Sequence, residues 1–212
     1  MNFQRQTGIF DPKDHLDRKV TVIGVGAVGS FVTLALAKMG ISRIEVWDGD
    51  KVAEHNLPNQ FYRSEDVSEL KVNALQDIVW KFAGVELETH PVRYEGKERL
   101  SGMVIVAVDS MDMRKALWLH IRRQPTVEFL LDFRMGGEVA LIYAIRPDRD
   151  RDFYEQTLHS SAEAFHARCT EASIIYTVLG IACFGAGIVK KYLTGQPYPK
   201  ELTVDFKLGM IL

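Results

Sequence analysis

The sequence is poor in cysteine, and this scarcity limits the structural chemistry that the chain can use. Its 212 residues include two cysteines, Cys169 and Cys183, which stand in different surroundings. Neither belongs to a Cys-x-x-Cys pair, the usual spacing of zinc ligands. We therefore expect no disulfide framework and no structural zinc.

An excess of charge of either sign is also lacking. The 26 Lys and Arg residues nearly balance 28 Asp and Glu residues, for a formal net charge of −2. This balance gives no reason to expect nucleic acid or an anionic membrane surface as a partner. Residues 1–6 show no apolar core of a signal peptide. We expect a soluble cytoplasmic protein.

Charge is absent altogether from one long stretch, residues 173–189. Its length lies near the lower limit for crossing a bilayer, so a membrane span is one alternative. We favour a helix buried on most of its surface, against a sheet or a partner subunit, because a lone span would leave a charged, β-like tail behind it. Cys183 falls within this stretch, and we expect it in the core.

Glycine, in contrast, is concentrated near the N-terminus in a meaningful pattern. An apolar strand over residues 19–23 leads into Gly24-x-Gly26-x-x-Gly29, and a helix is predicted over residues 27–39. In such a turn Gly24 permits the tight bend, Gly26 lets the backbone approach a phosphate, and Gly29 lets helix and strand pack closely. The N-terminus of the helix offers free N–H groups to an anion.

The next strand, predicted over residues 43–47, ends on a carboxylate. Asp48 follows that strand directly and is placed to accept hydrogen bonds from ribose hydroxyls. A long polar loop over residues 49–67 then begins at the carboxyl edge of the sheet, where ligands bind in open α/β folds. These features predict a nucleotide site.

The remaining pattern alternates helices and apolar strands, as an α/β fold requires. We expect an N-terminal arm over 1–18, helices over 68–82 (N-capped by Ser68) and from Asp112 to Ile121, strands over 86–92, 103–108, 127–131, 138–145 and 202–206, and a crossover over about 148–170 that carries Cys169. The fold class is a Rossmann-like, doubly wound and mostly parallel sheet with an antiparallel C-terminal portion. One domain covers residues 1–212.

Several polar residues beyond the glycine turn follow a more specific order. They are Asp48-x-Asp50-x-Val52, Asn56-Leu57-x-x-Gln60, Lys71, and Asp109 after an apolar strand. Together with the glycines, this series resembles the ThiF, MoeB and HesA family and the related ubiquitin-activating adenylyltransferases. The dipeptides Arg5-Gln6 and Cys169-Thr170 resemble family positions in the N-terminal arm and before the apolar helix.

The resemblance implies an enzyme that binds MgATP and adenylates the C-terminal carboxylate of a small ubiquitin-like, β-grasp protein. It implies that Asp48 binds ribose, that Lys71 faces the phosphates, and that Asp109 holds Mg²⁺. By the same resemblance, Asp50, Asn56 and Gln60 bracket the nucleotide, Arg5 reaches the γ-phosphate from the other subunit of a homodimer, and Cys169 accepts the acyl group as a thioester. A downstream conjugating enzyme or a sulfur acceptor would complete the pathway.

The chemistry fits these residue types, because a carboxylate attacking ATP brings negative charges together and needs cations nearby. Simpler interpretations stay open for each residue. Lys71 alone would be an ordinary solvated helix lysine, Asp109 could be a helix cap although Asp112 suits that role better, and Cys169 could be an inert thiol. We favour a reactive Cys169, since His166, Arg168 and the start of a helix would lower the pKa of its thiol.

The sequence also departs from the family pattern. Asn59 stands where the family carries an arginine that contacts phosphate, and Arg63, one turn further on, is a candidate replacement. Two other functions therefore remain: a non-catalytic partner subunit, which Asn59 supports, and an NAD-dependent oxidoreductase, which the glycine turn and Asp48 allow.

Overall fold

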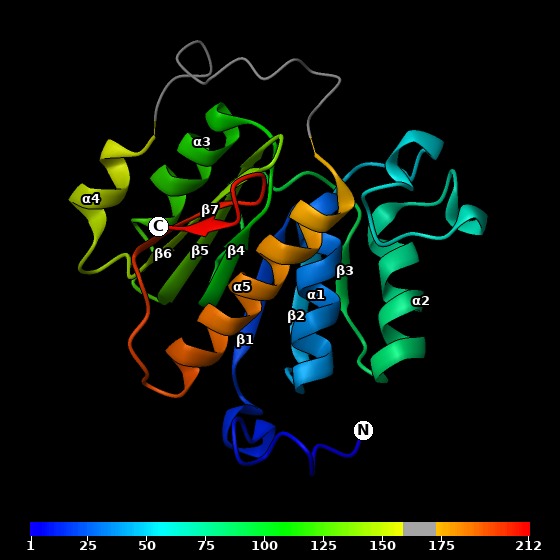
Figure 1. Cartoon of the computed structure of the whole chain (residues 1–212), viewed down its shortest axis with the longest axis horizontal. Coiled ribbons are helices and arrows are strands. Elements are labelled where there is room, and N and C mark those ends of the chain that lie inside the picture. Colours follow the sequence, from blue (N-terminus) through cyan, green and yellow to red (C-terminus); the bar gives the residue numbers. More distant parts are fainter. Residues whose placement is uncertain (159–172) are drawn as a thin grey trace.

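A computed structural model of the chain describes residues 1–158 and 173–212 (Figure 1). Its helices and strands alternate along the chain. In order they are β1 (Lys19–Ile23), α1 (Ala27–Met39), β2 (Arg43–Trp47), α2 (Lys71–Ala83), β3 (Glu88–His90), β4 (Gly102–Val106), α3 (Met111–Ile121), β5 (Val127–Gly136), β6 (Val139–Ile145), α4 (Arg151–Gln156), α5 (Ile175–Leu193), β7 (Glu201–Asp205) and β8 (Met210–Ile211). Short 3-10 turns, η1 (Pro12–His15), η2 (Glu54–Asn56) and η3 (Ser64–Asp66), lie in the connections.

The strands of the described chain form one eight-stranded sheet in the order β3-β2-β1-β4-β5-β6-β7-β8. The first five strands in this order run parallel, and β6, β7 and β8 are added antiparallel. The predicted antiparallel C-terminal portion is thus confirmed. The chain crosses from β3 back to β4 beside β1, which places a topological switch point at the carboxyl ends of β1 and β4.

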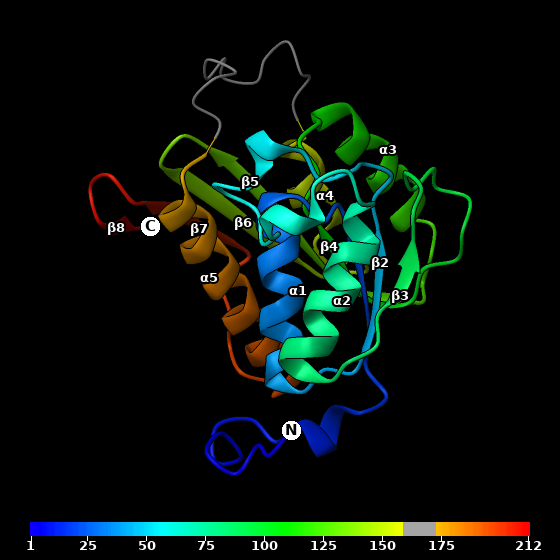
Figure 2. The ribbon, with the colours of Figure 1, turned by 90° about the vertical axis from the view of Figure 1, so that its right-hand side faces the viewer.

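Helices cover both faces of the sheet, as Figures 1 and 2 show from two sides. One hydrophobic core lies between the sheet and the layer of α1, α2 and α5, and a second lies beneath α3 and α4. This arrangement confirms the predicted doubly wound fold. It leaves the carboxyl edge of the parallel strands, at the top of Figure 1, as the place where loops and helix N-termini gather.

The bounds predicted for β1, α1 and β2 are those that the structure shows. Gly40 ends α1 in the left-handed conformation, with φ of 102°, and its N–H bonds to carbonyls of the last turn. A glycine adopts this conformation without the Cβ clash that other residues meet, so Gly40 suits the end of this helix.

Two helix starts differ from the prediction. Ser68 has a φ of 77° and reverses the chain before α2, which begins at Lys71 after Leu70. Helix α3 is capped by Ser110, whose hydroxyl accepts a hydrogen bond from the N–H of Met113 at 3.3 Å. Asp112 therefore lies within the first turn and not at the cap. Caps depend on which side chain turns back to the amides, and neighbouring Ser and Asp residues compete for that position.

The uncharged stretch forms α5, which packs against α1 and β6. Gly185 of this helix lies so close to the Phe133 ring that a Cβ would approach ring atom Cζ to 2.1 Å. Among the described helices, α5 alone has the length and composition of a membrane span, but 44% of that window is already buried in the fold. In the single chain less than half of this window is therefore buried, and the expectation that a partner subunit covers the rest stays a prediction. The expectation that Cys183 lies in the core is wrong, because Cys183 is exposed. Only one side of α5 faces the protein.

Candidate nucleotide site at the carboxyl edge of the sheet

The glycine turn connects β1 to α1 and requires glycine at two positions. Gly24 has a φ of +88°, and a Cβ on it would lie 2.7 Å from the carbonyl oxygen of Ala107. A Cβ on Gly29 would lie 1.9 Å from the carbonyl oxygen of Gly24. At Gly26 the nearest atom to such a Cβ is the Nε2 of Gln60, at 3.7 Å. The turn is therefore closed at its base and open at Gly26, where a phosphate could approach the backbone.

Asp48 lies beside this turn, at the carboxyl end of β2. Its Oδ2 accepts a hydrogen bond from the N–H of Val25, and its Oδ1 accepts one from the N–H of Asp50, both at 2.9 Å. The carboxylate thus holds the glycine turn and the following loop together while remaining partly exposed. Its predicted contact with ribose stays a prediction.

Lys71 is buried rather than free on the helix surface. Its side chain is 8% exposed, and its Nζ lies 3.1 Å from Oδ2 of Asp50. The two residues are also joined through the backbone, since the N–H of Lys71 donates to the carbonyl of Asp50 at 3.0 Å. Partial burial acts to raise the pKa of Asp50, but the hydrogen bond and charge of Lys71, with Arg93 nearby, lower it below its usual value. An ammonium and a carboxylate are thus fixed at this edge.

Asn56 is the last residue of η2, and Gln60 lies in the loop that follows it. The side-chain oxygen of Asn56 accepts from the N–H of Ala53 at 3.1 Å, and its carbonyl accepts from the N–H of Gln60 at 3.0 Å. The Oε1 of Gln60 is buried without a hydrogen-bond partner. A buried oxygen of this kind usually has a partner, so Gln60 fits a place where a ligand donates a hydrogen bond.

One further anchor, Tyr62, is not among the site residues predicted from the sequence. Its buried hydroxyl donates to the carbonyl of Val25 at 2.6 Å and ties this loop to the glycine turn. Burial, with a smaller effect of Asp48, raises the pKa of Tyr62 well above its usual value, so the hydroxyl keeps its proton. The only sequence signal was an aromatic residue within a polar loop.

Arg63 does not take the place of the family arginine at whose position Asn59 stands. Its guanidinium pairs with the carboxylates of Asp66 and Asp77, at 2.6 and 2.7 Å, and also with Glu65. Asn59 instead donates to the hydroxyl of Ser173 at 2.5 Å. Asn59 thus joins this loop to Ser173, two residues before the start of α5.

Asp109 follows β4 on the same edge and is exposed. Strand β4 ends at Val106, so Asp109 stands three residues beyond the strand rather than on it. Its oxygens are of the type that Mg²⁺ prefers. Elsewhere in the described part of the chain, Glu45, Glu88 and His90 form a group with ligand atoms within 4.8 Å of one another, on β2 and β3.

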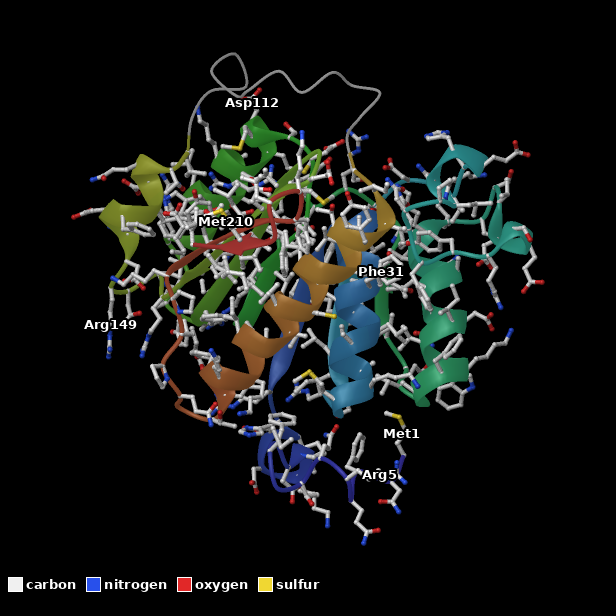
Figure 3. All side chains as sticks on the ribbon, in the orientation of Figure 1. Met1, Arg5, Phe31, Asp112, Arg149 and Met210 are labelled. Carbon is white, nitrogen blue, oxygen red and sulfur yellow. The ribbon has the colours of Figure 1, made fainter. Side chains whose placement is uncertain are left out.

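Arg5 lies far from this edge in the same chain. The arm is tied to the last turn of α1, where Gln6 Nε2 donates to the carbonyl of Met39 at 2.7 Å. The 13 residues of α1 separate it from the glycine turn by about 20 Å. Figure 3 labels Arg5 at the end of the molecule opposite Asp112 of α3. Only another copy of the chain could bring an Arg5 to this site.

Cys169 lies outside the described residues, as do His159, His166 and Arg168. Of the predicted site residues that the structure describes, only Arg5 lies away from the carboxyl edge (Figure 3). The others gather there: Gly24, Gly26, Gly29, Asp48, Asp50, Asn56, Gln60, Lys71 and Asp109.

The fold and this edge define a class: a Rossmann-like α/β domain with a glycine turn, a carboxylate after β2, and a buried lysine at the start of α2. The sequence matches the ThiF family over residues 4–207, and the chain belongs to this family. The resemblance predicted from the sequence is confirmed.

Two relatives named as activating enzymes match parts of the chain. Ubiquitin-like modifier-activating enzyme 5 of Caenorhabditis briggsae is 34% identical over 91 residues, which are 42% of this chain and 21% of that protein. The NEDD8-activating enzyme E1 catalytic subunit of Arabidopsis thaliana is 32% identical over 111 residues, 50% of this chain and 24% of that protein. The chain spans about a quarter or less of these relatives.

Solved structures show the same fold. E. coli MccB with AMPCPP and MccA superposes with a TM-score of 0.78 at 15% identity, over 95% of this chain and 64% of that chain. E. coli MccB with ATP gives a TM-score of 0.74 at 15% identity and the same coverage.

Proposed function

We propose that the chain is an adenylation domain that binds ATP with Mg²⁺ and adenylates the C-terminal carboxylate of a small ubiquitin-like protein. The observation that carries the proposal is the fixed group of Asp48, Lys71 and the glycine turn on one edge of the sheet. The relatives named as ubiquitin-like modifier-activating and NEDD8-activating enzymes support the substrate class. Membership of the ThiF family sets aside the NAD-dependent oxidoreductase.

The reaction needs an anion to approach an anion. A carboxylate oxygen of the substrate attacks the α-phosphorus of ATP, the bond from that phosphorus to the bridging oxygen breaks, and pyrophosphate leaves with the electron pair. The products are an acyl-adenylate and pyrophosphate. Positive groups must therefore lie close to the phosphates before the reaction begins.

The residues of this chain fit that need. Lys71 presents an ammonium that is already desolvated and held by Asp50, so little ordering is required when a phosphate binds. Gly26 leaves its backbone accessible, and Gln60 offers an unpartnered acceptor. Asn56 shapes the same loop. Asp109 would hold Mg²⁺, which neutralises phosphate charge when bound.

The position of Arg5 supports a homodimer as part of this proposal. Since Arg5 lies beyond the far end of α1, it serves a γ-phosphate only if a second copy packs so that opposite ends meet. The exposed side of α5 offers an apolar surface for that copy, formed by Ile175, Tyr176 and Leu179. A two-fold axis across α1 and α5 would bring each arm to the partner's carboxyl edge.

The cytoplasm remains the expected location, and Cys169 remains the proposed thioester acceptor after adenylation. The non-catalytic partner subunit is the second candidate. Its support was Asn59, and the bond from Asn59 to Ser173 gives this residue a structural role that is independent of phosphate binding.

Calorimetry with MgATP tests the proposal on the purified chain. Lys71→Met should weaken ATP binding about 10- to 100-fold, because a hydrogen bond to a charged group contributes about 1.5–3 kcal/mol. Lys81→Met is the matched control on α2, since Lys81 is exposed and pairs with Asp77 at the surface. Equal ATP affinity in both variants, or binding of NAD⁺ in place of ATP, would overturn the assignment.

A further inference from the structure

A buried carboxylate lies beneath the candidate metal residue. Asp132 of β5 is 0% exposed, in the middle of the sheet. Such a carboxylate is tolerated only when cations and hydrogen bonds replace its water. Its Oδ1 accepts from Nε of Arg114 at 2.9 Å, while its Oδ2 accepts from Nε of Arg134 at 2.8 Å and from the Tyr154 hydroxyl at 3.0 Å. Both oxygens are occupied inside the protein, so Asp132 is not itself a ligand.

Arg114 extends this network toward the carboxyl edge. It lies on α3 and is 5% exposed. Besides Asp132, its Nη2 donates to the carbonyl of Phe133 at 2.6 Å and to the carbonyl of Val108. These bonds hold the planar guanidinium in one orientation, in which it also restrains the peptide immediately before Asp109.

Asp109 is consequently held from both sides. Arg114 holds the preceding carbonyl, and Ser110, the following residue, caps α3 with its hydroxyl. The carboxylate of Asp109 itself is exposed. A fixed backbone that presents a free carboxylate is the arrangement that a preorganised cation site needs.

We propose that Arg114 and Asp132 are positioning residues that orient Asp109 toward the divalent cation bound with ATP. This inference rests on the proposed function. Neither residue touches the nucleotide: Arg114 acts through the Val108 carbonyl, and Asp132 acts through Arg114. Loss of such outer-shell partners typically lowers metal affinity 10- to 100-fold. A lysine at position 114 keeps the charge but cannot reach Asp132 and both carbonyls together.

The test is the dissociation constant of ATP, measured by calorimetry once with Mg²⁺ and once with EDTA. The ratio of the two constants is the metal enhancement. In Arg114→Lys the enhancement should fall about tenfold or more, with the EDTA constant within about twofold of wild type, and raised Mg²⁺ should restore it. A merely structural role would weaken binding under both conditions.

Two further variants serve as controls for the metal enhancement. Asp109→Asn should remove the enhancement. Arg122→Lys should keep it, because Arg122 follows the last turn of α3 and pairs with Glu155 at 2.8 Å, away from Asp132. If Arg114→Lys does not fold, Asp132→Asn replaces it with the same expectation.

The outcomes separate the inference from the function. An unchanged enhancement in a folded Arg114→Lys or Asp132→Asn variant overturns the positioning role. A wild-type chain that binds ATP equally with Mg²⁺ and EDTA refutes the metal role of Asp109 and, with it, the inference. A wild-type chain that does not bind ATP refutes the proposed function itself.

Discussion

The glycine turn allows one prediction to be worked out from atomic distances. An added Cβ at Gly29 would lie 1.9 Å from the carbonyl oxygen of Gly24, where real contacts are above 3.0 Å. The clashing atom belongs to the backbone of the turn, so the strand and helix must separate by more than 1 Å. At Gly26 the nearest atom is 3.7 Å away, in a flexible side chain. Gly29→Ala and Gly26→Ala therefore form a matched pair.

Gly29→Ala should mainly lower stability, and Gly26→Ala should mainly lower ATP binding. Overpacking costs about 1–3 kcal/mol in cores with flexible neighbours, and a backbone clash should cost at least about 3 kcal/mol. For a domain of this size, Gly29→Ala should then lower the melting temperature by roughly 6–12 °C. Gly26→Ala should lower the free energy of unfolding by about 1 kcal/mol or less, since it changes only the N-cap residue of α1. It should nevertheless lose MgATP binding, because a methyl group would occupy the approach of the phosphate.

The assay is differential scanning calorimetry without nucleotide, followed by titration with MgATP. An unchanged melting temperature in Gly29→Ala would refute the packing argument. Wild-type ATP affinity in Gly26→Ala would show that the phosphates bind elsewhere.

Further predictions concern the rest of the fold. Burial acts to raise the pKa of Glu45, but hydrogen bonds and the charge of Lys19 outweigh burial and lower this pKa below 4.5. The ionised Glu45 therefore stabilises the fold fully above about pH 4.5, and this stabilisation is lost as the pH falls through the pKa of the folded state. Glu45→Gln should flatten the decline in urea-unfolding free energy below about pH 5. Gly185→Ala should cost about 1–3 kcal/mol in chemical unfolding, and adding Phe133→Leu should recover part of it; full additivity of the two would contradict the contact. Tyr62→Phe removes a hydrogen bond to the glycine turn and should lower stability by about 1 kcal/mol, with no change expected if the hydroxyl is instead solvated.

Several parts of the site could be predicted because they are local. The strand, turn and helix around Gly24 and Gly29 are encoded by residues whose own backbone needs define the structure. The position of Asp48 could be predicted because it directly follows the strand over residues 43–47. Gly40 similarly marked the end of α1.

Other parts depended on segments that are far apart in the sequence. Asp132 lies just beyond the strand predicted over residues 127–131, and no sequence pattern linked it to a partner. Its two arginines come from α3 and β5, so the pairing required the packed structure. Arg63 looked available for phosphate until the fold placed Asp77 of α2 beside it. Cys183 looked buried because its neighbours are apolar, but its side of α5 faces outward.

By itself, the sequence determined the α/β class, the order of the elements, the glycine turn and the family, since periodicity and glycine positions act over a few residues. Tertiary structure alone decided that Lys71 is buried beside Asp50 and that Arg5 lies at the opposite end from the site (Figure 3). It also decided that Arg114, paired with the buried Asp132, bonds to the carbonyl just before Asp109. Charges interact over distances in space, and those distances exist only once the chain has folded.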